Sequence, residues 1–260
     1  MTLDYSSYLE LDGLLSLQRP RAEGPAHDEM LFIVIHQTYE LWFREVLHEL
    51  DHLQAALEQG EAPAARLTLT RLRRIFRLLV DQWDVLETMT PGGFASFRDA
   101  LETASGFQSA QFREVELVLG KRDPRALEHH AEGSEAHKRL HSRLAAPSVY
   151  TSFLRYLIAR GHAIPQEAVE RTITESCPAS PEVQQVLAAA RDGSTEVAEL
   201  CEGLVDLDQS LQTWRYRHVK VVERIIGQGH GTGGSTGAEY LRSTLFSPLF
   251  PDLWALGGQV

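Results

Sequence analysis

Hydrophobic side chains recur every three or four residues along most of this 260-residue chain, which is the pattern of helices with one buried face. After the Pro- and Gly-rich stretch RPRAEGPAHDE, a long helix is predicted from Asp28, whose side chain can cap it, to about Gln59. A second helix is predicted from Pro63 to Met89, where the turn TPGG stops it. The buried faces expected for these two helices carry Phe43, Val46, Leu50, Leu53 and Leu57, followed by Leu67, Leu72, Ile75, Leu79, Trp83 and Leu86.

Shorter helices follow, and no stretch alternates with the period of two that marks a strand. The composition turns polar between residues 121 and 147, which predicts a solvated outer segment. Because no Pro/Ser-rich linker divides the chain, we predict one all-α domain over 1–260, with an N-terminal segment at 1–27 and a Gly-rich loop at 228–237. The remaining helices are expected at 94–103, 107–119, 148–160, 181–190 and 195–227, the last closed by Gly227.

Charge and cysteine content exclude several classes of protein. Lys and Arg number 25 against 36 Asp and Glu, and the resulting net charge of −11 would repel a phosphate backbone, so no nucleic-acid partner is expected. Cys177 and Cys201 form neither a CxxC pair nor a disulfide framework, which is typical of small apolar residues in a reducing compartment. The N-terminus MTLDYSSYLELDGLL lacks a signal sequence, and no apolar run is long enough to span a bilayer. We therefore expect a soluble, cytoplasmic protein with no membrane partner.

His218 lies on the apolar side of the last long helix, in the stretch WRYRHVKVVERIIGQGHGTGGSTG. Its imidazole is therefore expected to point inward. The helical stripe that it shares contains Trp214, Val221, Val222 and Ile225, while Arg215, Arg217, Lys220 and Glu223 are expected elsewhere on the helix.

A second histidine, His36, occupies a similar position, one turn after Phe32 and before Tyr39 and Phe43 on the same apolar face. A lone histidine in such a place is more often a hydrogen-bonded core residue than a catalytic one. Two inward histidines far apart in sequence, with no CxxC motif or carboxylate cluster, also suit a haem held by one axial ligand in a helical protein. The pattern by itself leaves these alternatives open.

The segment HELDH, from His48 to His52, matches the H-E-x-x-H pattern of zinc proteases. Both histidines fall opposite the apolar face of their predicted helix, so they are expected to face water, which argues against a zinc hydrolase. His137 and His141 repeat the spacing in a still more polar segment and are interpreted in the same way.

Two further features carry possible chemistry. Arg98 stands beside Phe94 and Phe97, where its guanidinium would either clamp a substrate carboxylate in a bidentate bond or pair with Asp99 or a neighbouring helix. The loop GHGTGGSTG follows no strand and lacks the lysine of a phosphate-binding loop. It is interpreted either as a lid that supplies a hydroxyl from Thr232 or Ser235, or as a merely flexible connection.

Several longer strings are more specific. YSSYLELDGLL, HDEMLFIVIHQTYELWF, SGFQSAQFREVE and WRYRHVKVVERIIG with GTGGSTG follow one another along nearly the whole chain. In this order they resemble the tryptophan 2,3-dioxygenase family. The resemblance implies an all-helical homotetramer that contains haem b, ferrous when active, and uses dioxygen to open the pyrrole ring of L-tryptophan to N-formyl-L-kynurenine.

The resemblance also assigns roles to residues in the matching motifs. His218 in RYRHV takes the place of the axial ligand of the haem iron, and His36 in HQTYELW takes that of the histidine that hydrogen-bonds the indole N–H. Arg98 in FRD would bind the substrate carboxylate, and Thr232 in GTGGS would contact its ammonium and carboxylate groups. The other implied residues are Phe32, Phe94, Phe97 and Leu101 around the indole, Ser105 and Gly106 at the haem edge, and Tyr5 and Tyr8, which match a segment that helps to close a neighbouring subunit's pocket.

The alternative function with the same scaffold is a haem monooxygenase of secondary metabolism that converts a tryptophan derivative to an oxindole. A haem sensor or carrier without turnover would need no substrate clamp, so Arg98 together with His36 argues against it.

Overall fold

The computed structural model describes residues 2–170, 176, 178–227, 241–242 and 245–258. Within these residues every regular element is a helix, which confirms the all-α class. The elements are α1 (Tyr5–Tyr8), α2 (Leu11–Leu14), α3 (His27–Glu58), α4 (Ala62–Leu86), α5 (Pro91–Ala95), η1 (Arg98–Leu101), η2 (Gly106–Gln108), α6 (Ala110–Leu119), η3 (Pro124–Leu127), α7 (Glu135–Ala145), α8 (Val149–Ala159), α9 (Gln166–Val169), α10 (Pro181–Gly193), α11 (Thr195–Ile226), α13 (Pro251–Ala255) and η4 (Leu256–Gly258).

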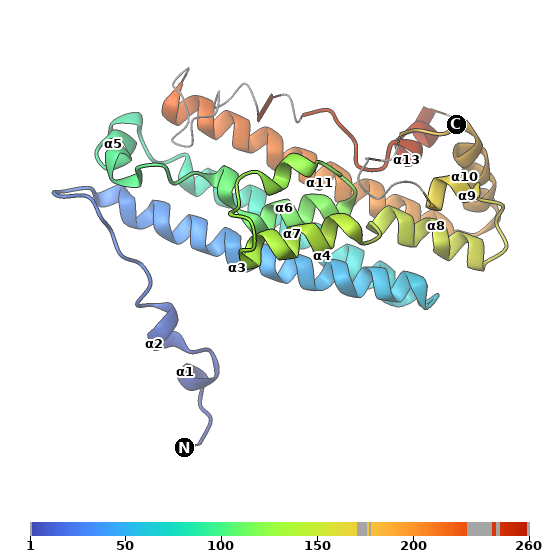
Figure 1. Cartoon of the computed structure of the whole chain (residues 1–260), viewed down its shortest axis with the longest axis horizontal. Coiled ribbons are helices and arrows are strands. Elements are labelled where there is room, and N and C mark those ends of the chain that lie inside the picture. The colour runs from blue at the N-terminus through green and yellow to red at the C-terminus, as the bar shows by residue number, and fades with distance from the viewer. Residues whose placement is uncertain (1, 171–175, 177, 228–240, 243–244, 259–260) are drawn as a thin grey trace.

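Three long helices, α3, α4 and α11, run alongside one another and form the centre of the molecule (Figure 1). Their facing stripes bury Leu50, Leu72 and Leu204. Helices α4 and α11 approach closely at Gly203, where a Cβ atom would lie only 2.9 Å from Cδ1 of Leu69. Helix α6 packs on α3, and α7 packs on α6, whereas α10 and α13 gather at the opposite end of α11 from its C-terminus (Figure 1).

Most of the long helices agree with the sequence pattern, with two local errors. Helix α3 begins at His27, and Asp28 stands in its first turn instead of capping it, because Ala26 occupies the cap position. There the carboxylate still lies at the end of the helix dipole that favours negative charge. Leu67, predicted to be buried, is 63% exposed because it lies on the outer face of α4. Helix α11 ends at Ile226 as predicted, and Gly227 follows it with a positive φ of 61°.

The helix predicted over 94–103 is broken into two pieces. Helix α5 ends at Ala95, and the 3-10 turn η1 starts at Arg98. Glu102 then adopts a positive φ of 49°, which ends any helical continuation. The break turns the aromatic residues of this segment toward the centre of the molecule.

The polar segment 121–147 is not merely a solvated outer segment, so that prediction was wrong. It contains α7, which Ser134 caps and which buries Leu140 and Leu144 against Leu117 of α6. Arg122 is also buried, and its guanidinium donates hydrogen bonds to the backbone carbonyls of residues 143, 144 and 146. Two leucines one turn apart are enough to hold a helix most of whose other positions are polar.

The C-terminal segment is held in place by two buried carboxylates. Asp208 of α11 accepts hydrogen bonds from the backbone N–H of Leu249 at 2.7 Å and from the indole N–H of Trp254 at 2.8 Å. Asp252 accepts one from the hydroxyl of Tyr150 at 2.9 Å, which ties α13 to α8. The hydrophobic pattern alone did not predict α13, whose five residues are too few to show a period.

The N-terminal helices α1 and α2 stand away from the main body (Figure 1). Buried Glu29 of α3 fixes the chain where it joins the body by accepting the backbone N–H groups of Arg21 and Ala22 at 2.6 and 3.0 Å. None of the helices in the described part of the chain is long and apolar enough to cross a membrane.

Candidate functional site

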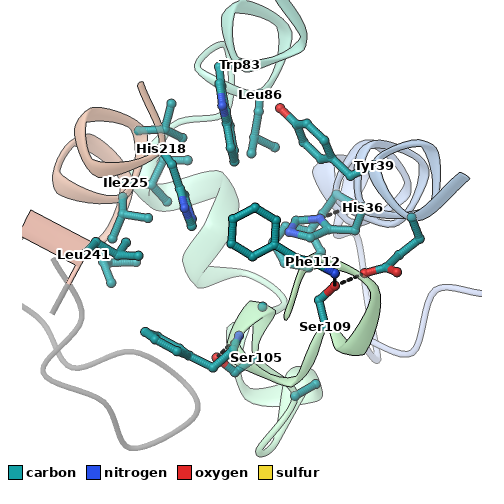
Figure 2. Close-up of a pocket in the computed structure, with 18 of the residues that line it drawn as sticks. His36, Tyr39, Trp83, Leu86, Ser105, Ser109, Phe112, His218, Ile225 and Leu241 are labelled. Atoms are coloured by element: carbon teal, nitrogen blue, oxygen red, sulfur yellow. Dashed lines mark hydrogen bonds between the residues drawn. The ribbon is translucent and has the colours of Figure 1, made fainter. Parts of the chain in front are cut away.

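A pocket opens between α3, α4, α11 and the segment from α5 to α6 (Figure 2). His36 enters it from α3, and His218 enters it from α11. Most of the other lining side chains are aromatic or aliphatic: Phe32, Tyr39, Phe43, Trp83, Leu86, Met89, Phe94, Leu101, Phe107, Phe112, Trp214, Val221, Val222, Ile225, Ile226 and Leu241. The pocket is therefore an apolar, concave site with a few polar groups, as expected for a large organic ligand.

His218 lies on the inward stripe that the sequence predicted. Its ring stacks on that of Trp83, with centroids 4.9 Å apart and planes inclined by only 8°. Burial, together with smaller effects of the nearby His36 and Arg113, lowers the pKa of His218 to about 4. The imidazole is therefore neutral at pH 7, and its unprotonated ring nitrogen keeps the lone pair that coordination of a metal requires.

His36 is held by its own helix. Its Nδ1 lies 2.7 Å from the backbone carbonyl oxygen of Phe32, and because a carbonyl can only accept, Nδ1 carries the proton. The lone pair of the neutral ring is then on Nε2. Burial lowers the pKa of His36, while the Phe32 carbonyl and the charge of Glu40 raise it by less. His36 is therefore a hydrogen-bond acceptor toward the pocket at neutral pH.

Phe32 and Phe94 line the pocket beside His36, and Phe97 packs against both rings. The Phe32 ring lies 6.0 Å from that of Phe94 and 5.3 Å from that of Phe97, and Phe94 and Phe97 meet edge to face. Arg98 follows directly and lines the pocket together with Leu101. Both η1 residues reach the pocket because the chain breaks its helix at Phe97, which places a cation beside an aromatic surface.

The segment before α6, from Ser105 to Ser109, forms another wall of the pocket. The Ser105 hydroxyl accepts the backbone N–H of Phe107 at 3.4 Å, which caps the short turn η2. Gly106 lines the pocket, and a Cβ atom there would meet nothing within 4 Å. The space beside this turn is consequently open to a ligand edge.

A buried charge cluster adjoins the pocket and was not foreseen from the sequence. The Glu116 carboxylate lies 2.5 Å from Arg113, 2.7 Å from Arg215 and 3.0 Å from Lys121. Burial raises the pKa of Glu116, but the three cations together lower it to about 2. Of this cluster, Glu116, Arg113 and Arg215 line the pocket, so the wall there carries one negative and two positive charges.

Arg215 was predicted to lie away from the stripe of His218, yet it is 4% exposed and lines the pocket. The prediction was wrong because a helical period cannot reveal that a charged residue has a buried partner 99 positions away, at Glu116. The Arg-x-x-Glu spacing at Arg113 on α6 was the one local signal available.

Comparison with known proteins now assigns the chain to a family. The family model described as "Tryptophan 2,3-dioxygenase" matches residues 1–198 and 190–260. The chain belongs to the tryptophan 2,3-dioxygenase family. It is 53% identical to a protein named tryptophan 2,3-dioxygenase from Herpetosiphon aurantiacus over 98% of this chain and 97% of that protein. The proteins of the same name from Anaeromyxobacter sp. (strain K) and Caulobacter vibrioides are 54% and 46% identical, over 98% of this chain and 96% and 97% of theirs.

The structure brings together most of the residues to which the tryptophan 2,3-dioxygenase resemblance gives a role. Tyr5 and Tyr8 are the exception among the described residues, because they are 76% and 70% exposed on the N-terminal arm and do not line the pocket. Thr232 and Ser235, on the loop 228–237, lie outside the described residues. The residues that do line one pocket are Phe32, His36, Phe94, Arg98, Leu101, Ser105, Gly106 and His218, while Phe97 packs behind the aromatic wall.

The zinc alternative finds no support in the described part of the chain. His48 and His52 are exposed on the outer side of α3, as predicted. Within the residues that the structure describes, no group of three or more His, Cys, Asp or Glu side chains is arranged to hold a metal ion.

Proposed function

We propose that this chain, as a member of the tryptophan 2,3-dioxygenase family, inserts both atoms of dioxygen into L-tryptophan and opens the pyrrole ring to give N-formyl-L-kynurenine. The observation that carries this proposal is the placement of two neutral imidazoles, His36 and His218, on different helices around one apolar pocket (Figure 2). One histidine serves the cofactor and the other serves the substrate.

The residues present fit a haem. His218 would hold the haem iron through its neutral imidazole, and Ser105 with the open space beside Gly106 would border the edge of the group. The indole N–H group of Trp83, which stacks on His218, is buried without an acceptor among the described residues, and such a donor is commonly satisfied by a bound group or water. When bound, the haem iron would supply the capacity to bind and activate dioxygen.

The buried charge cluster around Glu116 supplies cations that would orient the cofactor. Haem carries two propionate groups, and an apolar pocket must provide cations for them. Arg113 lies at the rim of the cluster, with its guanidinium over the rings of Phe107 and Phe112 and within the pocket lining. It is the side chain that we propose for a propionate, while Glu116 keeps Arg215 and Lys121 partly neutralised.

The other wall suits an indole amino acid. Nε2 of His36 would accept the indole N–H, since Nδ1 is committed to the Phe32 carbonyl. Phe32, Phe94 and Leu101 would surround the ring, where aromatic contacts favour tilted and edge-on geometries, and Phe97 packs behind them. Arg98 would hold the carboxylate in a forked, charge-assisted bond, and Thr232 from the loop would contact the ammonium and carboxylate groups.

We further propose that the active form is a homotetramer in which the N-terminal arm completes the pocket of a neighbouring subunit. The arm exposes Leu3, Tyr5 and Tyr8 to more than two thirds of their full extent, and its helices α1 and α2 stand off the body of their own chain (Figure 1). A second copy that receives these side chains would remove this apolar surface from water.

The reaction stoichiometry tests the proposed function. A dioxygenase consumes one dioxygen per L-tryptophan and needs no external electrons, because both oxygen atoms enter one product. A monooxygenase needs two electrons per turnover to reduce the second oxygen atom to water. We expect the ferrous protein to turn over L-tryptophan repeatedly, with equimolar uptake of dioxygen and no added reductant. A rate that depends on a continuing supply of reductant would contradict the proposal.

A further inference from the structure

Glu40 stands on α3 one turn after His36 and lines the pocket, but neither the cofactor nor the substrate has been given a contact with it. Its Oε1 accepts the hydroxyl of Ser109 at 2.5 Å, and its Oε2 accepts the side-chain amide of Gln111 at 2.8 Å. The same amide also donates to the backbone carbonyl of Glu40 at 2.9 Å. Both carboxylate oxygens are thus engaged with the start of α6.

The partners of Glu40 occupy a decisive place in the pocket wall. Ser109 is the N-cap of α6, and its hydroxyl oxygen accepts the backbone N–H of Phe112 at 3.2 Å. The turn with Ser105 and Gly106 immediately precedes Ser109. Figure 2 shows Ser109 and His36 on adjacent walls, with the bonds of Ser109 drawn as dashed lines. One carboxylate therefore joins the helix that carries His36 to the segment that borders the proposed haem edge.

We propose that Glu40 is a positioning residue, which fixes the wall from Ser105 to Phe112 at a set distance from His36. A carboxylate suits this task because it accepts both donors without rotating, and charge-assisted bonds are stronger than neutral ones. The wall itself contains only the three-residue turn η2 before α6, so it has few backbone bonds of its own. The consequence for ligand binding rests on the proposed function, whereas the consequence for the wall does not.

Graded substitutions at Glu40 separate geometry from general destabilisation. Glu40→Met keeps the length of the side chain but removes both acceptors, so the bonds to Ser109 and Gln111 are lost. Glu40→Gln is the conservative variant, because its amide oxygen can still accept one of these two donors. Glu45→Met changes a half-buried glutamate on the same helix outside the pocket lining and is the matched control. Gln111→Met removes only the amide bonds and serves if Glu40→Met does not fold.

Hydrogen exchange on the full-length holoprotein measures the wall directly. We expect Glu40→Met to speed exchange in peptides covering 105–112 about tenfold, as loss of a charge-assisted bond implies. Glu40→Gln should speed it less, and Glu45→Met should leave it unchanged. Gln111→Met should speed exchange in the same segment. Unchanged exchange in Glu40→Met or Gln111→Met, or exchange as fast in Glu40→Gln as in Glu40→Met, would overturn the proposal.

The affinity for L-tryptophan provides a second measurement. L-tryptophan binding, titrated through the change in haem absorbance, should weaken about fivefold or more in Glu40→Met and less in Glu40→Gln. Normal binding in Glu40→Met would remove the positioning role for the substrate. If the wild-type holoprotein fails to bind L-tryptophan, the proposed function fails, and the exchange experiment still decides the role of Glu40 in the wall.

Discussion

The two pocket histidines reach the same neutral state in different ways, and this difference separates their roles. His218 has rings of Trp83 and Trp214 as neighbours and no hydrogen-bond partner within the described residues, so its nitrogens remain available. His36 has Nδ1 committed to its own helix, so only Nε2 can act. Coordination suits the first histidine, and recognition of a substrate N–H suits the second.

Removal of the proposed axial ligand should release the cofactor. His218→Ala leaves no imidazole on the α11 wall, so we expect the variant to purify with less than about a tenth of the wild-type haem and with a changed Soret band. His48→Ala on the exposed side of α3 is the control and should retain normal haem content. Added imidazole should partly restore the spectrum of His218→Ala. Full haem content with an unchanged spectrum would assign the ligand elsewhere.

Arg98 should affect the carboxylate of the substrate specifically. A charge-assisted bidentate bond is worth roughly 1.5–3 kcal/mol, so Arg98→Ala should weaken L-tryptophan binding at least about tenfold. Arg98→Lys keeps the charge but loses the fork, and an intermediate effect is expected. Tryptamine, which lacks the carboxylate, should bind the variants and the parent nearly equally. Equal losses for both ligands would mean that the substitution disturbs the aromatic wall and not a clamp.

The pH dependence of catalysis follows from the lowered pKa of His36. Its ordinary value is 6.5, and burial, opposed by the Phe32 carbonyl and Glu40, holds it lower in the folded chain. His36 therefore stays neutral at pH 6.5 and above, and its Nε2 loses the ability to accept the indole N–H only as the pH falls through the lowered value. We expect the acid limb of kcat/KM for L-tryptophan to lie below pH 6.5. An acid limb above pH 6.5, or one unchanged in His36→Ala, would contradict this role.

The orientation of a single residue was predictable where the helical period alone decides it. It was not predictable where it depends on a contact with a residue far away in the sequence. His36 and His218 each lie on an apolar stripe, so the sequence indicated that both point inward. The buried cluster around Glu116 joins α6 to α11, and no local pattern reveals such a contact. Glu40 was missed for the same reason, since its partners lie 69 and 71 positions away.

At the scale of elements, the C-terminal segment depends on one buried carboxylate of α11. Asp208 is fully buried and accepts the N–H groups of Leu249 and Phe250 and the indole N–H of Trp254 through one oxygen. Asp208→Asn weakens these charge-assisted bonds, so we expect the free energy of unfolding to fall by about 2–4 kcal/mol. Denaturation by urea measures the change.

A neighbouring aspartate provides the control for that substitution. Asp206, two residues earlier on α11, is 41% exposed and pairs with Arg73 at the surface. Asp206→Asn should change stability by less than about 1 kcal/mol, because exposed ion pairs contribute little. Comparable losses in both variants would mean that Asp208 does not fasten the C-terminal segment.

Long helices were predictable because many turns repeat one apolar stripe, and short ones were not. The apolar stripes of α3, α4 and α11 extend over six or more turns, so one exposed leucine such as Leu67 does not change the prediction of a helix. Helix α7 has only Leu140 and Leu144 as buried residues, and α13 has five residues in all. Helix α7 is stabilised by packing on α6, and α13 is stabilised by the hydrogen bonds of Asp208 and Asp252.

At the scale of the whole molecule, three helices and one broken segment create a site that no single element contains. Helix α3 contributes His36, α11 contributes His218, and the break after α5 turns Arg98 into the same pocket. The family resemblance, carried by long strings in the right order, indicated this convergence, whereas the helical pattern alone left open whether each histidine is a core residue or serves a haem site. In the proposed homotetramer, the N-terminal arm would add side chains from a second subunit to this site.

The fate of the two oxygen atoms distinguishes ring opening from simple hydroxylation. The ferrous holoprotein is incubated with L-tryptophan under dioxygen in which both atoms are the heavy isotope, and the mass of the product is measured by mass spectrometry soon after it forms. We expect N-formyl-L-kynurenine with two heavy oxygen atoms, because both atoms of one dioxygen bond to the pyrrole carbons of the substrate when that ring opens. A product with one heavy oxygen atom and an intact indole ring system would contradict the proposed function and assign the protein a monooxygenase reaction.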